Sequence, residues 1–315
     1  MKKPIGILRA LLGVVMLAAC AESPTEPPTK PPEPEPEWVY EGQWGSEFYE
    51  PCGVAVAPDG NVYVADANNH RIEYFTATGS FRGRWGSLGN GNGQFAYPVG
   101  VAVATNGHVY VTDLGNDRVQ YFTSSGSFVG KWGSDGTGNG RFHGPHGLAV
   151  ASNGNVYVTD FGNYRVQYFT SGGSFLGKWG SKGSGNGQFS GPRGIGVAPD
   201  GNVYVGSAGD ERVQYFTASG SFLGKWGAPG PGNGQFQGLY GITVAPNGNV
   251  FAADHFKDRV QYFTSTGSFL GKFGAHGTGN GQFIQPGDIA LSPSGDRVYV
   301  SDVFNHRVQY FKRRA

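Results

Sequence analysis

An arginine recurs along this chain at an almost constant interval. Successive copies stand 47 residues apart, except the last pair, which is 48 apart: Arg71, Arg118, Arg165, Arg212, Arg259 and Arg307. The one additional residue falls in the turn around Gly295 and Asp296. A period of this length predicts a structure built from stacked copies of one unit, either the blades of a propeller or the turns of a solenoid.

The strand content of the unit decides between these two architectures. In the copy around Arg165, short apolar or β-branched segments occupy 146–151, 155–160, 165–170 and 174–180, separated by turns rich in Gly, Asn and Ser. No segment after residue 20 has the hydrophobic period of a helix. Four short strands joined by tight turns are typical of a propeller blade.

The two ends of the repeat region complement each other. Residues 38–45 match the fourth strand of a unit, and residues 307–312 match the third. The N-terminal strand is therefore expected to complete the last blade and close the ring, which removes exposed strand edges. The sequence predicts an all-β fold: a six-bladed β-propeller of four-stranded antiparallel blades over residues 38–315.

Composition agrees with this fold and limits the function classes. The 55 glycines beside 14% aromatic residues suit many short strands and tight turns. Residues 38–315 hold 20 Lys plus Arg against 18 Asp plus Glu, so they lack the basic stripe that RNA binding needs. Only two cysteines occur, too few for a disulfide framework.

Residues 1–20 have the pattern of an export signal. Basic Lys2 and Lys3 precede an apolar run at 11–18, which is too short to span a bilayer permanently. Small residues then lead to Cys20, and this ending resembles the lipobox of bacterial lipoproteins. The resemblance implies cleavage before Cys20 and acylation of its thiol and amine. An ordinary secretory signal with an incidental cysteine is the alternative.

The segment after Cys20 predicts a spacer and a location. Residues 21–37 are rich in proline and contain little to bury, so we expect a semi-rigid tether between the lipid and the propeller. Ala21 follows the cysteine, and in the lipoproteins that the segment resembles a residue other than Asp there implies the outer membrane of a Gram-negative bacterium. The expected organisation is 1–20 signal peptide, 21–37 tether and 38–315 propeller.

The repeat itself resembles a known family. The pattern P-x-G-[IVL]-A-V-A-x-[DN]-G-N-V-Y-V-[AT]-D-x-x-N-x-R-[VI]-x-x-F is similar to the NHL repeat, and residues 98–122 and 145–169 follow it closely. Residues 51–75 do so with Cys52 at the variable position. NHL propellers serve as RNA-binding modules, protein-binding modules, extracellular sensors and, in some relatives, lyases. The resemblance therefore implies the fold and leaves the activity open.

A repeated acidic residue is interpreted as scaffold. An Asp stands five residues before the recurring Arg in five of the six units, which places the two across a hairpin loop where a charge-assisted hydrogen bond would fasten the loop. The predicted structural pairs are Asp66 with Arg71, Asp113 with Arg118, Asp160 with Arg165, Asp254 with Arg259, and Asp302 with Arg307.

Positions where the units differ are the candidates for function. First strands lie nearest the axis of a propeller, so the residues at their starts should ring the mouth of the channel. These are Cys52, Val99, His146, Arg193, Tyr240 and Gly287, with Asp288 beside the last. Varied chemistry on a constant frame is typical of a ligand-binding face.

The fourth unit departs furthest from the others. Ser207 replaces its Asp, so Arg212 loses the usual partner, although Asp210 and Glu211 stand nearby. We predict a pocket for an anion made by Arg193, Tyr240 and His146, with Ser207 leaving room. Sequence drift in a tolerant loop is the alternative interpretation.

A metal-dependent catalytic role is the alternative to a binding role. NHL-type amidating lyases, which this fold resembles, use several His at first-strand starts to hold zinc, whereas here only His146 occupies such a place, with His70, His306 and His255 in nearby loops. No metal or other cofactor is therefore predicted, although zinc or calcium stays open, and no catalytic residue is assigned. Cys52 is expected to be structural.

The function predicted from the sequence is that of a lipid-anchored binding or scaffold protein of the cell envelope. It would be monomeric and would present the channel mouth to a protein partner or a small anionic ligand, and it would not bind nucleic acid. A lyase or hydrolase that uses a metal at the mouth is the alternative, so whether the protein is an enzyme is left open.

Overall fold

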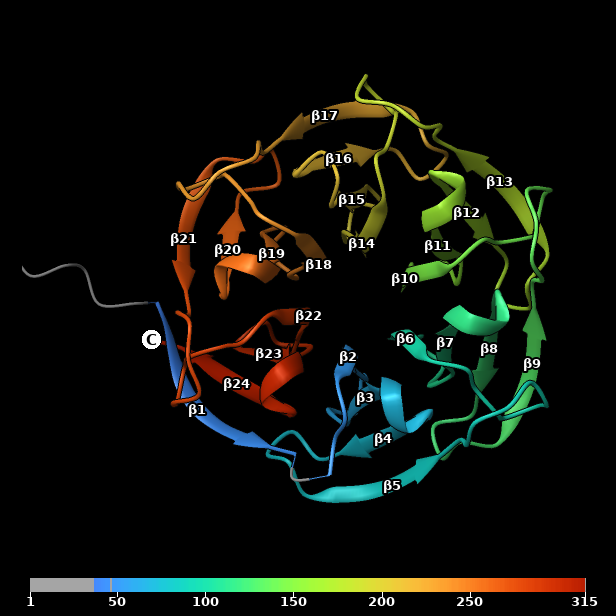
Figure 1. Ribbon diagram of the computed structural model, residues 1–315, viewed down its shortest axis with the longest axis horizontal. Coiled ribbons are helices and arrows are strands. Elements are labelled where there is room, and N and C mark those ends of the chain that lie inside the picture. Colours follow the sequence, from blue (N-terminus) through green and yellow to red (C-terminus); the bar gives the residue numbers. More distant parts are fainter. Residues whose placement is uncertain (1–36, 46, 315) are drawn as a thin grey trace, which may run out of the picture. The chain divides into compact units, whose positions relative to one another are not determined.

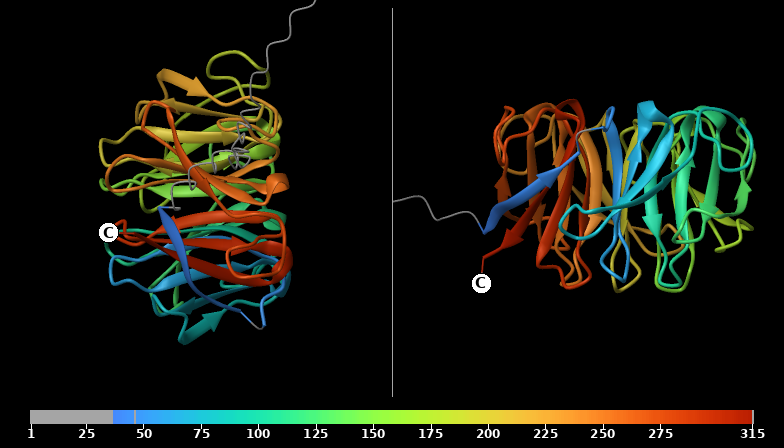
Figure 2. Two further views of the ribbon diagram at one scale, coloured as in Figure 1. Left: turned by 90° about the vertical axis from the view of Figure 1, so that its left-hand side faces the viewer. Right: turned by 90° about the horizontal axis from the view of Figure 1, so that it is seen from below.

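The computed structural model describes residues 37–45 and 47–314. The predicted signal, the lipidation residue Cys20 and nearly all of the tether lie outside the described residues. Within the described part, six four-stranded antiparallel sheets stand around a central axis, and the side view shows their strands in profile (Figures 1 and 2). No helix in the described ranges is both long and apolar enough to cross a membrane.

Each sheet is one blade, and its strands are given below in order from the axis outward. Blade 1 contains β2 (Pro51–Val56), β3 (Val62–Asp66), β4 (Arg71–Phe75) and β5 (Phe81–Trp85). Blade 2 contains β6 (Pro98–Val103), β7 (Val109–Asp113), β8 (Arg118–Phe122) and β9 (Phe128–Trp132). Blade 3 contains β10 (Pro145–Val150), β11 (Val156–Asp160), β12 (Arg165–Phe169) and β13 (Phe175–Trp179).

The other three blades follow the same plan. Blade 4 contains β14 (Pro192–Val197), β15 (Val203–Ser207), β16 (Arg212–Phe216) and β17 (Phe222–Trp226). Blade 5 contains β18 (Leu239–Val244), β19 (Val250–Asp254), β20 (Arg259–Phe263) and β21 (Phe269–Phe273). Blade 6 contains β22 (Pro286–Leu291), β23 (Arg297–Asp302), β24 (Arg307–Arg313) and β1 (Trp38–Trp44).

A short 3-10 turn joins the second and third strands in five blades. These turns are η1 (Ala67–Asn69), η2 (Leu114–Asn116), η3 (Phe161–Asn163), η4 (His255–Lys257) and η5 (Val303–Asn305). They lie on the face of the ring that is nearer the viewer in Figure 1. The following residue takes a left-handed conformation in each case.

The N-terminal strand closes the ring as predicted. β1 pairs with β24 in a sheet of order β1-β24-β23-β22, and the register joins Trp38 to Arg313 and Trp44 to Val308. Trp38 is buried and packs edge-on against Phe251 of blade 5. The first and last described segments are therefore held together in one blade by strand pairing and by aromatic packing.

The five Asp–Arg pairs form at the ends of the second strands. In each pair Arg Nε donates to the Asp Oδ2 at 2.7 Å, and every one of these Asp side chains is fully buried. The guanidinium of Arg165 also donates to the carbonyl oxygens of Thr137, Gly138 and Arg141. The Asp–Arg pair thus holds in place the loop that leads into the blade, because charge-assisted hydrogen bonds are stronger than neutral ones.

A ring of glycines lets the inner strands approach one another closely. A Cβ on Gly194 would lie 2.1 Å from the carbonyl oxygen of Tyr240, and one on Gly147 would lie 2.3 Å from that of Arg193. Gly53 and Gly100 meet the next blade in the same way. Backbone-to-backbone contact of this kind holds the starts of the first strands, and so the mouth residues, in fixed positions.

Candidate functional site

A cavity of about 690 Å³ opens at the end of the ring where the 3-10 turns lie. Its walls come from the starts of the six first strands and from the first residues of the turns. All seven predicted mouth residues line it: Cys52, Val99, His146, Arg193, Tyr240, Gly287 and Asp288. The start of each first strand therefore does face the axis, because the strands converge there.

Arg193 on β14 is the fixed cation of the cavity. Its Nη1 donates to His146 Nε2 at 3.0 Å, and its Cζ lies 4.1 Å from the ring centroid of Tyr240 and 4.8 Å from that of Phe161. The Nε atom is buried and has no hydrogen-bond partner. No carboxylate among the described residues forms an ion pair with Arg193. The guanidinium is thus held by aromatic faces and a neutral ring, with its charge uncompensated.

His146 on β10 serves as an acceptor. Burial lowers the pKa of His146 to about 3, and the neighbouring Arg193 guanidinium adds to the decrease. The imidazole is therefore neutral at physiological pH, and it must carry its proton on Nδ1 because Nε2 accepts from Arg193. A neutral His146 orients the guanidinium without neutralising it.

Tyr240 on β18 joins Arg193 to a second histidine. The rings of Tyr240 and His255 stack at 3.9 Å between centroids with an interplanar angle of 3°. His255 Nδ1 donates to the carbonyl oxygen of Pro286 at 3.0 Å. Burial lowers the pKa of His255 as well. Tyr240 is thus sandwiched between a cation and a fixed imidazole, which leaves it little freedom to move.

Asp288 on β22 is the acidic group of the cavity. Its Oδ2 accepts from the backbone amide of Val54 at 3.2 Å, and its own amide donates to Ser301 Oγ at 2.8 Å. Burial raises the pKa of Asp288 to about 7, although the backbone amides of Ile289 and Val54 lower it in part. No cationic side chain of the described residues pairs with it.

The raised pKa of Asp288 predicts a pH-dependent stability. The folded protein holds this proton more tightly than the unfolded chain, so its stabilising contribution is present at low pH and is lost as pH rises through about 7. Asp288→Asn keeps an acceptor for Val54, and we expect it to gain roughly 2–4 kcal/mol relative to wild type between pH 4 and pH 8. Urea unfolding at both pH values measures this. The lowered pKa of His146 changes the stability with pH in the opposite direction, but it does so in both proteins and cancels in the comparison. A difference independent of pH would contradict the prediction.

Cys52 is the second residue of β2 and lines the cavity. Its Sγ contacts the carbonyl oxygen of Glu50 at 3.5 Å, and Tyr97 OH donates to Glu50 Oε2 at 3.3 Å. Burial raises the pKa of the Cys52 thiol to about 12. The thiol is therefore not ionised at neutral pH, and it lacks the thiolate character of a nucleophile.

Ser207 does not line this cavity, although the sequence interpretation placed it there. The side chain is fully buried at the end of β15, where it accepts from the amide of Ser190 at 3.0 Å and donates to Asp210 Oδ2 at 3.0 Å. Asp210 Oδ2 lies 3.5 Å from Arg212 Nη2. In blade 4 the carboxylate that pairs with the recurring Arg belongs to Asp210, three residues after Ser207. Ser207 is therefore part of the scaffold.

The other histidines of the mouth region also have defined contacts. His70 Nδ1 accepts from the amide of Tyr97 at 3.0 Å, and His306 Nδ1 accepts from that of Glu50 at 3.2 Å. Each contact links one blade to the next. Neither histidine points to a common metal site with His146, and the ring of Tyr240 lies between His146 and His255.

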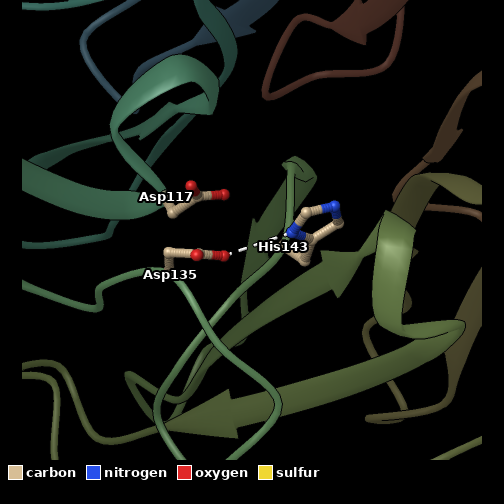
Figure 3. Close-up of side chains that lie close together, drawn as sticks. All are labelled: Asp117, Asp135 and His143. Atoms are coloured by element: carbon tan, nitrogen blue, oxygen red, sulfur yellow. Dashed lines mark hydrogen bonds and ion pairs between the residues drawn. The ribbon is translucent and has the colours of Figure 1, made fainter.

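One group of three metal-ligating side chains gathers beside the mouth cavity in the described structure, and His143 of this group also lines that cavity. Ligand atoms of Asp117, Asp135 and His143 lie within 4.8 Å of one another (Figure 3). His143 Nδ1 and Asp135 Oδ1 are 3.2 Å apart, which raises the pKa of His143. Asp135 and His143 are exposed, and Asp117 already accepts from the amide of Gly144. The ion pair explains this cluster without a metal.

The family model for the NHL repeat matches residues 48–75, 95–122, 142–169 and 283–311. These segments fall in four of the six equivalent blades that the structure shows. The protein is an NHL-repeat six-bladed β-propeller. Arg193 and Tyr240 lie in the other two blades of this NHL propeller, outside the matched residues.

A short stretch of the chain is similar to one curated protein. Protein brain tumor of Drosophila melanogaster is 47% identical over 51 residues, which is 16% of this chain and 4% of that protein. The chain therefore spans a small fraction of the curated relative that it matches.

Solved structures resemble the propeller over most of its length. The gluconolactonase XC5397 of Xanthomonas campestris has a TM-score of 0.65 at 15% identity, covering 86% of this chain and 88% of that one. Virginiamycin B lyase of Staphylococcus aureus has a TM-score of 0.61 at 14% identity, covering 86% and 98%. Hydrazine synthase of Kuenenia stuttgartiensis has a TM-score of 0.61 at 13% identity, covering 86% and 97%. At these identities the likeness shows the fold alone.

Several cavity residues of the NHL propeller were missed by the sequence interpretation. Phe161 and His255 are the first residues of η3 and η4, directly after the recurring Asp. The equivalent position holds Ala67, Leu114, Ala208 and Val303 in the other blades. This variation is the same signal that identified the first-strand positions, and it marks Phe161 as well; His255 was named from the sequence only as a histidine of a nearby loop. Glu50 and Tyr97, just before β2 and β6, were missed for the same reason.

Proposed function

We propose that this NHL propeller is a non-catalytic binding protein that takes a small organic anion at its channel mouth. One observation carries the proposal: a partly buried guanidinium with no acidic partner. Charged groups taken out of water are normally paired, because desolvation costs several kcal/mol. Arg193 is desolvated by Tyr240 and Phe161 and is bonded to a neutral imidazole. A bound anion would supply the missing counter-charge.

The shape and lining of the cavity support an organic ligand over a bare inorganic ion. A volume of about 690 Å³ is in the range of pockets for small molecules. Val99, Leu148 and Ile195 contribute apolar wall beside the polar groups. Nη2 of Arg193, which has no hydrogen-bond partner in the described residues, and the second N–H of Nη1 can bind a carboxylate through two hydrogen bonds. A ligand that carries a carboxylate on an apolar group fits both the guanidinium and the apolar wall.

The test is calorimetric titration of hexanoate and benzoate into the protein that begins at Ala21. We expect Arg193→Gln to weaken binding by about tenfold or more, because the charge-assisted fork is lost while the aromatic contacts remain. The matched control is Arg82→Gln, which removes an exposed arginine of β5. Equal affinities of wild type and Arg193→Gln for every carboxylate, or no binding to wild type, would contradict the proposal.

A metal-dependent lyase or hydrolase is the second candidate, because solved structures with this fold include a lactonase and a lyase. The mouth offers His146 and His255, but they lie on different sides of Tyr240, and no third ligand joins them within the described residues. Elemental analysis of protein purified without chelator or histidine tag tests this alternative. Stoichiometric zinc or calcium would favour it.

We further propose that lipid on Cys20 anchors the protein in the cell envelope, on the support of the sequence around that residue. Expressed with its signal in a Gram-negative host, the full chain should fractionate with the outer membrane, since two or more acyl chains give stable attachment. Cys20→Ser should move most of the protein to the soluble fraction. Cys52→Ser, which removes the other cysteine, should leave it in the membrane. Membrane retention of Cys20→Ser would contradict lipidation.

A further inference from the structure

We propose that the ligand of the mouth cavity is dipolar: an amino-carboxylate whose carboxylate binds Arg193 and whose protonated amine binds Asp288. The inference rests on the proposed anion site and deepens it by naming the substrate class. It follows from a second charge in the cavity that a simple anion would leave unmatched.

Asp288 is placed to receive a cation. It lines the mouth cavity and also the narrower space of about 180 Å³ that continues between the first strands. One carboxylate oxygen accepts from Val54, which fixes the group on the wall. No Lys, Arg or His of the described residues pairs with it. The acceptor capacity of a carboxylate exceeds one backbone hydrogen bond, so the ionised Asp288 can bind an ammonium group without a rearrangement of its contact with Val54.

The two charges stand on different walls of the cavity, with blade 5 between Arg193 and Asp288. Arg193 and His146 begin β14 and β10, whereas Asp288 begins β22 and Glu50 precedes β2. Figure 1 shows β22 across the axis from β10, and β2 across from β14. The cavity therefore has its cation, Arg193, on blade 4 and its carboxylates, Asp288 and Glu50, on blades 6 and 1. No ion pair in the described structure joins these walls.

A dipolar ligand would pair with the cation and with the carboxylate of the cavity at the same time. In a partly desolvated cavity, each unpaired charge interacts more strongly with an opposite charge than it would in water. A carboxylate without an amine would satisfy Arg193 but would face Asp288 and Glu50 across the cavity. An amine alone would face Arg193. Val99, Leu148 and Ile195 line the space between the walls, which suits a chain of methylene groups between the two charges.

The test compares matched ligands that differ only in charge. At pH 8, calorimetry measures binding of 6-aminohexanoate, hexanoate and hexylamine, and then of the corresponding series from four to eight carbons, so that one member matches the span between the walls. We expect at least one amino-carboxylate to bind wild type about tenfold tighter than its matched carboxylate. The amine alone should bind more weakly than either.

Two variants test which residue binds each charged group of the ligand. Asp288→Asn should reduce the preference for the amino-carboxylate to less than about threefold while hexanoate binds as well as before or better. Arg193→Gln should weaken both ligands. Asp59→Asn, in the exposed turn before β3, is the matched control and should change neither.

The outcomes separate the inference from the proposed function. If hexanoate binds through Arg193 but no amino-carboxylate of any length binds tighter, the dipolar inference is wrong and the anion site stands. If the preference survives in Asp288→Asn, the amine binds elsewhere and the inference is likewise wrong. If wild type binds neither class, both proposals fail. The comparison of ligands on wild type requires no variant to fold.

Discussion

Deletion of residues 38–44 is expected to destabilise the propeller by at least about 5 kcal/mol. The strand β1 brings Trp38 into the core beside Phe251 and Phe273, and losing a buried Trp alone costs about 3–5 kcal/mol. Trp44 packs against Tyr299 of blade 6 and Phe75 of blade 1, so it bridges the closing blades. The deletion also exposes β24 as an unpaired edge.

Because domains are stable by about 5–15 kcal/mol in total, this deletion should leave much of the protein unfolded or aggregated at 37 °C. Urea unfolding followed by circular dichroism measures the loss. Deletion of residues 21–36 is the control and should not change the midpoint. A peptide of residues 37–45 added in excess should recover part of the stability. A deletion variant as stable as wild type would show that the ring does not depend on its N-terminal strand.

Asp160→Ser is expected to cost about 3–5 kcal/mol, because it leaves a buried guanidinium without its counter-charge. The carboxylate accepts from the amide of His143, from Asn163 Nδ2, from Arg165 Nε and from Gln167 Nε2. All four donors lose a partner together, and unpaired buried donors carry a full desolvation penalty. Thermal and urea unfolding report the loss.

Blade 4 supplies the compensating change for this prediction. There Ser207 takes the place of the Asp, and Asp210 takes the place of the Asn three residues later. Asp210 accepts from the amide of Ser190 at 2.9 Å and from Ser207, and it pairs with Arg212.

The double variant Asp160→Ser/Asn163→Asp should therefore recover about half or more of the loss caused by Asp160→Ser, which appears as a coupling energy in a double-mutant cycle. Incomplete recovery is expected because Arg212 Nε in blade 4 is buried without a partner. Additive effects of the two changes would contradict the account of blade 4.

The fold could be predicted from the sequence because each blade repeats one set of contacts. The period, the strand pattern and the split blade each require the same ring, and β1 pairs with β24 as the matching segments indicate. The mouth positions were predictable for a related reason. Position in the first strand fixes distance from the axis, so His146, Arg193 and Tyr240 converge.

Side-chain direction limited the prediction of the site. Ser207 belongs to the end of β15, where the register opposes it to Arg212 and Pro192, and its side chain turns into the blade. A loop position alone does not reveal this. The packing of Arg193 on Tyr240 and the bond from Val54 to Asp288 join residues of different blades, and no local pattern encodes such contacts. The predicted lipid anchor is a property of residues outside the described part of the chain.

The central claim is that Arg193 is an anion receptor, and the NMR signal of its Nε–H group tests this most directly. The signal is assigned as the arginine Nε–H resonance that is lost in Arg193→Gln, and hexanoate or 6-aminohexanoate is then titrated into wild type. Because Nε belongs to the same guanidinium as the Nη atoms that would bind the carboxylate, binding should move this signal in a saturable way while those of Arg118 and Arg165 stay in place. An Arg193 signal that does not move, while either ligand binds or at the highest ligand concentration, would contradict the account.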